Sequence, residues 1–339
     1  MELAMVPASH APSGPAGVVL NRNAGRVTQA MTRRVRRLVG DDHLFLTESP
    51  EHAEEVLKLC VERQYSAVFA GGGDGTVIDT INTLERIRES GSNVPSVGVL
   101  RCGTGNALAR WVGAAKPEQA LSGWLGGRLH RRMRIRMLTS EGTLFPFGGL
   151  GNDAAVLNDY VKLKQRAKGT WAAGLCNGLS GYFLAGLGMT VPRYLRRGMP
   201  NVRVINTGGD AYLLDASGQP LGGPLARGAV LYDGPATTIG AATSPLIGYG
   251  FKFFPFATQR PGHFHLRVLN LSPLEAVASI PAGYKGTMAG AGVHDFHVNR
   301  CRMVFDRALP FQLGGDAMGY RNEVEFGLSD QPVTLIGQA

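Results

Sequence analysis

The stretch Ala67-Val-Phe-Ala-Gly-Gly-Gly-Asp-Gly-Thr76 joins a short apolar run to four glycines and one carboxylate. The apolar run predicts a buried strand, and the pattern from Thr76 to Arg88 predicts a helix directly after it. In an open α/β sheet, ligands bind beyond the carboxyl ends of the strands, where glycines let backbone N–H groups approach phosphate oxygens. The stretch therefore predicts a phosphate-binding turn, although a tight turn with Asp74 as the helix N-cap explains the same residues.

Short strands and helices alternate on both sides of this turn. Apolar runs predict further strands at Val18–Leu20, Leu44–Leu46 and Val97–Leu100, and amphipathic patterns predict helices at Val27–Val39 and Glu51–Arg63. This alternation is typical of a mainly parallel sheet covered by helices on both faces. We therefore expect a Rossmann-like, three-layer nucleotide-binding domain over residues 17–135, preceded by a disordered leader over residues 1–16.

Near residue 135 the predicted pattern changes from alternating strands and helices to mainly strands. Short alternating segments, separated by Gly, Pro and Asp, continue from there to Glu323–Phe326. Such a pattern predicts a β-sandwich-like domain over residues 136–339, interrupted by a helical insertion at Ala154–Arg197. The fold class is thus α/β plus β, and we leave open that the last strand packs back on the first domain.

A second glycine-rich loop follows the strand predicted at Val97–Leu100. It reads Arg101-Cys-Gly-Thr-Gly-Asn106, and another helix is expected after it. Loops that follow neighbouring parallel strands lie at one edge of the sheet, so Thr104 and the loop glycines can line the same nucleotide as the first loop. Asn106 can also be read as a helix cap. A third loop of this kind runs from Asn21 to Gly25, after the first strand.

These motifs resemble a known family. Gly72-Gly-Asp-Gly-Thr76, Gly103-Thr-Gly-Asn106, the opening Asn21 to Gly25 and Thr47 are similar to the diacylglycerol kinase-type catalytic domain of bacterial lipid kinases, sphingosine kinases and ceramide kinases. The resemblance implies an α/β nucleotide domain followed by a β-rich domain, with ATP and Mg²⁺ between them. It assigns to ATP the residues Asn21, Thr47, Gly72, Gly73, Asp74, Gly75, Thr76, Gly103, Thr104 and Asn106.

The resemblance also implies residues for the acceptor and for proton transfer. Asp153 matches an acidic position that faces the lipid head group in the sphingosine kinase branch, but it can equally cap the helix expected from Ala154. The family has an Asp-Gly-Glu segment near its C-terminus, where this chain reads Phe311-Gln-Leu-Gly-Gly-Asp-Ala-Met-Gly319. Either alignment of the two leaves Asp316 as the candidate general base, and an ordinary turn aspartate is the alternative. Asp74 is expected to organise Mg²⁺ or the acceptor hydroxyl.

Charge and apolar patterning suggest where the acceptor is found. The chain has 35 basic and 26 acidic residues, a formal charge of +9. Residues Thr170–Pro192 are uncharged and have lysines and arginines on both sides, which suits contact with an anionic membrane or, alternatively, the filling of an interdomain core. No nucleic-acid-binding motif is present. We expect a cytoplasmic protein, peripheral on the inner face of the membrane, and leave a homodimer open.

The expected function is a lipid kinase that transfers the γ-phosphate of ATP to a hydroxyl of diacylglycerol, ceramide or a sphingoid base. Two alternatives remain at this point. An NAD kinase-like enzyme shares the first glycine motif, and a non-catalytic nucleotide- or membrane-binding module is compatible with the altered Asp-Gly-Glu segment.

Overall fold

The computed structural model describes residues 14–127, 130–151, 154 and 198–338. This part of the chain divides into two compact units. One extends to Met137 and also contains Gly248–Gly250 and Asp330–Ala339. The other contains Leu138–Ile247 and Phe251–Ser329.

A six-stranded sheet forms the centre of the first unit, in the order β2-β1-β3-β4-β17-β5. Its strands are β1 (Ala16–Asn21), β2 (Leu44–Thr47), β3 (Ala67–Gly72), β4 (Ser96–Arg101), β17 (Val333–Gln338) and β5 (His130–Ile135). All neighbours are parallel except β5, which pairs antiparallel with β17 at the edge. The last strand of the chain thus lies inside the sheet, between β4 and β5.

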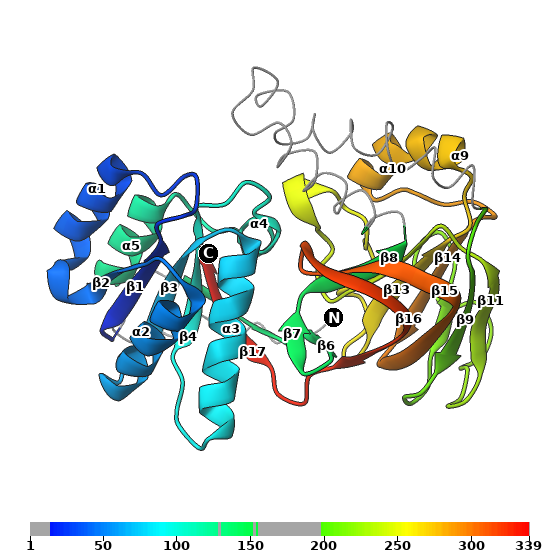
Figure 1. The fold of residues 1–339 in the computed structure, drawn as a ribbon, viewed down its shortest axis with the longest axis horizontal. Helices are drawn as coiled ribbons and strands as arrows, with labels where there is room; N and C mark the ends of the chain where they lie inside the picture. Colours follow the sequence, from blue (N-terminus) through cyan, green and yellow to red (C-terminus); the bar gives the residue numbers. More distant parts are fainter. Residues whose placement is uncertain (1–13, 128–129, 152–153, 155–197, 339) are drawn as a thin grey trace. The chain divides into compact units, whose positions relative to one another are not determined.

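Helices cover both faces of this sheet. The helices are α1 (Gln29–Val39), α2 (Pro50–Glu62), α3 (Asp74–Glu89), α4 (Ala107–Trp111) and α5 (Pro117–Leu125), with a 3₁₀ turn η1 at Asp41–His43. Helices α1 and α5 pack together on one face, and α2 and α3 pack together on the other (Figure 1). Alternation along β1 agrees with this division, since Val18 and Leu20 join the core of α1 and α5 while Val19 faces α2 and α3.

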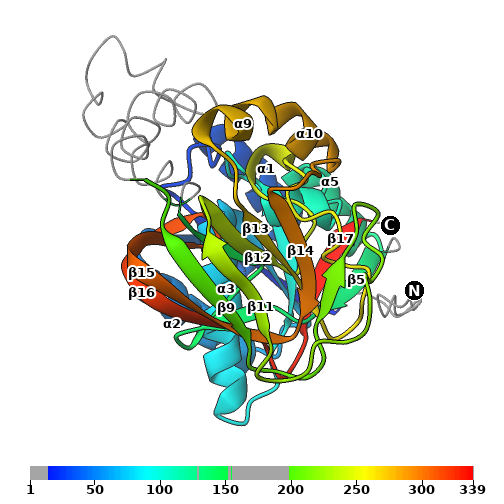
Figure 2. The same cartoon turned by 90° about the vertical axis from the view of Figure 1, so that its right-hand side faces the viewer.

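The second unit is built on one antiparallel sheet of eleven strands. They are β6 (Leu138–Ser140), β7 (Thr143–Phe145), β8 (Phe147–Gly151), β9 (Asn201–Asn206), β10 (Tyr212–Leu214), β11 (Val230–Pro235), β12 (Thr238–Ala242), β13 (Phe264–Leu269), β14 (Val293–Val298), β15 (Arg300–Leu313) and β16 (Asp316–Leu328). Strand β13 lies between β12 and β14 (Figure 2). The short helices α9 (Pro273–Ala278) and α10 (Ile280–Lys285) lie in its connections, whereas the 3₁₀ turn η4 (Gly248–Gly250), between β12 and β13 in the sequence, belongs to the first unit.

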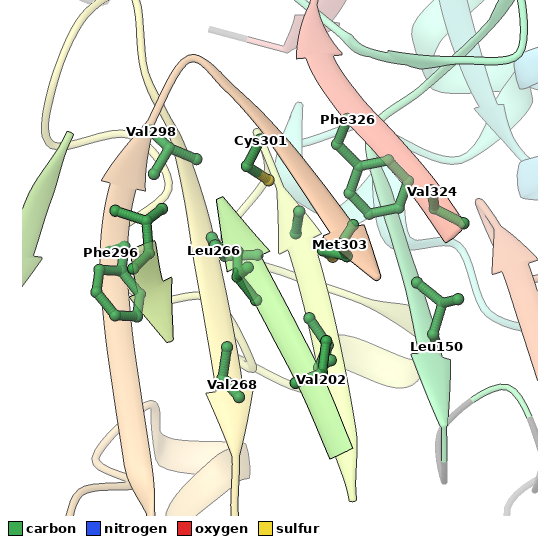
Figure 3. Packing of buried hydrophobic residues seen from close by; sticks show 14 of the residues in the cluster. Leu150, Val202, Leu266, Val268, Phe296, Val298, Cys301, Met303, Val324 and Phe326 are labelled. Carbon is green, nitrogen blue, oxygen red and sulfur yellow. The ribbon is translucent and has the colours of Figure 1, made fainter. Parts of the chain in front are cut away.

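The long strand β15 divides this sheet into two branches. Its first part pairs with β9, where Cys301 lies opposite Asn206, and its last part pairs with β8, where Phe311 lies opposite Leu150. Side chains from both branches, Val202 of β9 and Leu266 of β13 among them, gather in one hydrophobic cluster (Figure 3). One continuous sheet therefore supplies a shared core, where the sequence predicted a sandwich-like domain.

The order of strands and helices predicted up to β4 is confirmed, with shifts at the ends of elements. Strand β3 continues through Gly72, so the glycine run begins inside the strand. Strands β15 and β16 are far longer than the predicted segments Met303–Phe305 and Glu323–Phe326. The predicted helical insertion and the uncharged stretch Thr170–Pro192 lie outside the described residues. Within the described residues, no helix is both long and apolar enough to span a bilayer.

Candidate functional site

The two glycine-rich loops of the first unit touch each other. Strands β3 and β4 are parallel neighbours, and Gly72 lies opposite Arg101 at their carboxyl ends. A Cβ atom placed on Gly103 would lie 2.5 Å from the Cα atom of Gly73, so the two backbones meet with no room for a side chain. The structure thus brings Gly72–Thr76 and Gly103–Asn106 into one group.

Asp74 links the two loops through its side chain. Its Oδ2 accepts a hydrogen bond from the backbone N–H of Ala107 at 3.0 Å, and its Oδ1 accepts one from Leu108 at 3.1 Å. Asp74 is itself the first residue of α3, whose N-cap is Gly73, so the interpretation of Asp74 as the cap of its own helix is wrong. It caps α4 instead, a helix that begins 33 residues further along the chain.

Asn106 closes the second loop on itself. Its backbone is left-handed, with φ 50° and ψ 44°, and its side chain makes no capping bond to α4. Instead, Oδ1 accepts from the N–H of Gly103 at 3.0 Å, and Nδ2 donates to the carbonyl of Gly103 at 2.6 Å. Asn106 is buried while Thr104, at the tip of the loop, is exposed. Asn106 therefore shapes the loop from inside, and Thr104 is the residue that a ligand can reach.

A short segment from much later in the sequence also contacts this loop. The backbone N–H of Tyr249 donates to the carbonyl of Gly105 at 3.1 Å, within the first unit. Tyr249 has φ 63°, which is unfavourable for a bulky side chain and is retained only where the surroundings hold it. No sequence signal marked this residue, because the contact joins positions more than a hundred residues apart.

Asn21, Thr47 and Thr76 meet at the ends of β1, β2 and β3. Asn21 lies opposite Thr47 in the parallel register, and its Nδ2 donates to Thr76 Oγ1 at 3.1 Å. Asn21 Oδ1 also accepts from the backbone N–H of Asn23 at 2.9 Å, which fixes the turn after β1. The three residues that the family resemblance assigned to ATP from separate motifs are thus neighbours.

These three residues line one cavity of about 280 Å³ between the ends of β1 and β2 and the helices α2 and α3. Four carboxylates and one arginine also line it: Glu48, Glu51, Glu54, Asp79 and Arg86. This volume is close to the lower limit of small-molecule pockets, about 300 Å³. Apolar side chains such as Val19 and Leu57 complete the lining, in which carboxylates outnumber basic groups.

Several lining residues come from a polar stripe on α3, of which sequence reasoning predicted Thr76 and missed the rest. Thr76, Asp79, Thr80 and Thr83 recur at intervals of three and four residues, which places them on one face of the helix. Thr80 and Thr83 are buried. The helical spacing of these polar residues could be seen in the sequence, next to the apolar face formed by Val77, Ile78, Ile81 and Leu84.

Asp316 belongs to the second unit. It follows a hairpin turn in which Gly314 and Gly315 have φ 60° and φ 94°, and it lies opposite Leu313 in the ladder of β15 and β16. Its side chain is exposed, but the protein atoms packed around it raise the pKa of the Asp316 carboxyl above its ordinary value by desolvation. Asp153, the predicted acceptor-binding residue, lies outside the described residues.

The second unit contains a buried network of hydrogen-bonded charged side chains centred on Asp295. Asp295 accepts from Arg267 Nε at 2.6 Å, from Arg267 Nη2 at 2.8 Å and from His265 Nε2 at 2.8 Å. Burial alone raises the pKa of Asp295, but these hydrogen bonds outweigh it and lower the pKa to about 2. Burial lowers the pKa of His265, and it lowers the pKa of nearby His297 to about 4. All four side chains are buried, so solvent and substrate do not reach them.

Comparison with known proteins finds relatives of the first unit. Residues 15–136 match the family model of the diacylglycerol kinase catalytic domain. Diacylglycerol kinase 3 of Arabidopsis thaliana is 32% identical over 125 residues, which are 31% of this chain and 25% of the plant protein. Diacylglycerol kinase 7 of the same plant is 30% identical over 129 residues, which are 32% of this chain and 26% of that protein. The match thus spans about a quarter of the length of these relatives.

The whole chain resembles a solved bacterial structure. The crystal structure of a diacylglycerol kinase from Bacillus anthracis str. Sterne aligns over 96% of this chain and 97% of its own, with a TM-score of 0.63. The sequences are 14% identical, so this likeness shows the fold, a parallel α/β sheet combined with a large antiparallel one. Taken with the family match, it confirms the resemblance expected from the glycine motifs. Residues 15–136 are thus similar to the diacylglycerol kinase catalytic domain, and the fold of the whole chain is similar to that of a bacterial diacylglycerol kinase.

Proposed function

We propose that this protein is an ATP-dependent lipid kinase, which transfers the γ-phosphate of ATP to a hydroxyl group of a membrane lipid such as diacylglycerol, ceramide or a sphingoid base. The observation that carries the proposal is the pair of touching glycine loops, linked by Asp74, in a segment that matches the family model of the diacylglycerol kinase catalytic domain.

In this proposal the phosphates of ATP bind at the start of α3. No side chain caps this helix, and the first N–H groups of a helix have no partner within it. These groups, together with the positive end of the 16-residue helix, attract phosphate oxygens. Exposed Thr104 and the glycine backbones of the second loop would complete the phosphate site.

The nucleoside end of ATP would enter the neighbouring cavity. Its four carboxylates repel phosphate, but they can accept hydrogen bonds from ribose hydroxyls or from an adenine amino group. Asn21 and Thr47 lie where the cavity meets the strand ends and supply further donors and acceptors. This arrangement orients the nucleotide with its γ-phosphate away from the cavity.

A magnesium ion bound with the nucleotide would supply the positive charge that offsets the developing charge on the phosphates. Mg²⁺ in such sites takes one or two carboxylates together with phosphate oxygens and water. Asp74 fits this requirement, because it is the carboxylate within the glycine motif and carboxylate oxygens are ligands of Mg²⁺. We therefore propose Asp74 as the residue that contacts magnesium. The hydrogen bonds from the backbone of α4 fix the orientation of its carboxylate.

For the acceptor, we propose Asp316 as the group that takes the hydroxyl proton and Asp153 as the group that contacts the lipid head group. A raised pKa suits a general base better than an ordinary aspartate, because proton transfer is most efficient when the pKa approaches the working pH.

The test is transfer of label from [γ-³²P]ATP, with Mg²⁺, to diacylglycerol, ceramide, sphingosine and monoacylglycerol in mixed micelles and to NAD in solution. Labelling of one lipid, and its loss in an Asp316→Asn variant, would support the proposal. Labelling of NAD alone would assign an NAD kinase-like activity. Nucleotide binding without labelling of any acceptor would assign a non-catalytic module.

A further inference from the structure

The two faces of the first unit carry opposite charge. Helix α1, helix α5 and the exposed side of strand β5 together hold six arginines and one glutamate, a net charge of +5. Helices α2 and α3, on the opposite face, hold eight carboxylates and three basic side chains, a net charge of −5. Helices α1 and α5 lie on one face of the sheet and α2 and α3 on the other (Figure 1), so the helices of the first pair cover the positive face.

Strand β5 extends the positive face beyond the helices. Arg132 lies directly opposite Ile336, a member of the core under α1 and α5, and Arg134 lies opposite Thr334. Residues directly opposite in an antiparallel ladder share a face, so both arginines project on the side of α1 and α5. Met133 and Ile135 alternate with them and are buried.

Four of the six arginines are available to a partner. Arg34 and Arg36 form ion pairs with Glu118 and Asp41. Among the residues that the structure describes, Arg33, Arg37, Arg132 and Arg134 have no carboxylate partner, and all four are exposed. Arg33 and Arg37 are four residues apart in α1, so they lie on one side of the helix. We name Arg33, Arg37, Arg132 and Arg134 the basic face.

Exposed leucines accompany the basic face. Leu38 in α1 is 37% exposed and Leu125 at the end of α5 is 55% exposed. In the described part of the first unit, these two are the exposed large hydrophobic residues. Helices α1 and α5 pack against each other, so both leucines belong to the same side of the unit as the basic face.

We infer that the basic face, with Leu38 and Leu125, docks this protein on the surface of an anionic lipid bilayer. Guanidinium groups bind lipid phosphates with two hydrogen bonds each, and the leucines can enter the boundary between head groups and acyl chains. The paired apolar and basic character fits a bilayer better than a nucleic acid, which offers no apolar layer. The inference rests on the proposed function for its purpose, since a membrane lipid must be reached, but its evidence is independent of catalysis.

The experiment is sedimentation of the full chain with vesicles made of equal parts phosphatidylcholine and phosphatidylglycerol, without nucleotide or acceptor lipid. We expect the protein to bind these vesicles and not to bind vesicles of pure phosphatidylcholine. Binding should be lost near 1 M salt, where the Debye length falls to about 3 Å and the attraction between arginines and lipid phosphates is screened. Two double variants test the arginines, Arg132→Gln/Arg134→Gln and Arg33→Gln/Arg37→Gln. Each should bind the vesicles about 30-fold more weakly, because each removes two positive charges. Leu38→Ala/Leu125→Ala should weaken binding at every salt concentration at which the unsubstituted protein binds.

The matched control is Lys58→Gln/Arg88→Gln, which removes two positive charges from α2 and α3 and should leave vesicle binding unchanged. Equal loss in the control, or full binding by both arginine variants at an unchanged melting temperature, would overturn the inference. So would a change of oligomeric state in those variants without a change in vesicle binding, because the face would then contact a second protein copy.

Transfer of phosphate to a short-chain acceptor in detergent separates this inference from the proposed function. The basic-face variants should keep that activity, since none of the four arginines lies among the proposed nucleotide or acceptor residues. Vesicle binding by a chain that labels no acceptor would support the docking surface while the kinase proposal fails.

Discussion

The carboxylate of Asp74 caps the helix that begins at Ala107, at an Oδ2 to N distance of 3.0 Å. Helix N-termini carry a partial positive charge and favour an anion at this position. The bond ties the turn after β3 to the turn after β4, so the aspartate of the glycine motif has a structural task whatever it does for the ligand. Any substitution of Asp74 therefore changes two loops at once.

Asp74→Asn should lower both stability and nucleotide affinity. The amide retains one acceptor oxygen but turns an NH₂ group toward one of the two backbone N–H donors, which leaves that donor unsatisfied. A lost cap of this kind costs about 1–2 kcal/mol in the free energy of unfolding. Urea denaturation followed by circular dichroism, and ATP titration by calorimetry, measure the two effects.

Asp41→Asn is the matched control for that change. Asp41 is exposed and pairs with Arg36, and exposed pairs contribute about 0–1 kcal/mol. If Asp74→Asn and Asp41→Asn unfold at the same urea concentration, the cap has no energetic weight and the structural role of Asp74 is wrong.

Asn106 should tolerate glycine better than alanine. Glycine accepts the left-handed backbone of φ 50° but loses both side-chain bonds to Gly103, whereas alanine loses the bonds and also strains the backbone. We expect Asn106→Ala to be less stable than Asn106→Gly by about 1 kcal/mol, as thermal unfolding would show. Equal stability of the two variants would indicate that the left-handed conformation is not maintained in solution.

Asp316→Asn should reduce turnover by about 10²–10⁴-fold if Asp316 is the general base. The acid limb of the kcat profile tests the same role. A base must be deprotonated to act, and the pKa of Asp316 is raised, so turnover should fall with decreasing pH around a midpoint above about 3.9, the ordinary value for aspartate. Glu323→Gln on the same strand should leave both the rate and the midpoint unchanged.

The buried network around Asp295 should make stability dependent on pH. With a folded pKa of about 2, Asp295 contributes fully above its unfolded value of about 3.9, and the contribution disappears as the pH falls through 2. His297, with a folded pKa of about 4, is neutral in the folded state while the unfolded residue takes a proton below about 6.5. Stability should therefore decline between pH 6.5 and 4, and His297→Asn should reduce that decline while exposed His52→Gln should not.

Removing one partner of the network should cost more than removing both. Asp295→Leu leaves the Arg267 guanidinium buried without its carboxylate, at a cost of about 3–5 kcal/mol, whereas Arg267→Met/Asp295→Leu removes both charges. Urea midpoints of the two variants decide this. A double variant less stable than the single one would show that packing, and not charge, governs the site.

The sequence predicted those parts of the fold that depend on neighbouring residues. Strand β3, the following helix and the second glycine loop could be predicted because apolar runs and glycine clusters act over a few residues. The polar face of α3 was equally local, and Thr80 and Thr83 could have been found from their helical spacing.

The rest depends on contacts between distant residues. The hydrogen bond from the Ala107 N–H to Asp74 requires β3 and β4 to be neighbours in the sheet. No pattern within a few residues of either strand predicts that pairing. The full length of β15 was hidden because its pairing with β16 shifts register on either side of Leu309 and Pro310, which breaks the alternation that marks a strand. Strand β12, fully buried and rich in small residues, has no alternation to detect.

The position of β17 has a consequence for biosynthesis. The segment that sequence comparison delimits, residues 15–136, holds β4 and β5 but not the strand that separates them. About 200 further residues are translated before β17 emerges, which takes roughly 10–40 s at typical elongation rates. Until then the sheet lacks the strand between β4 and β5, so the N-terminal unit is completed only after the second unit has been translated.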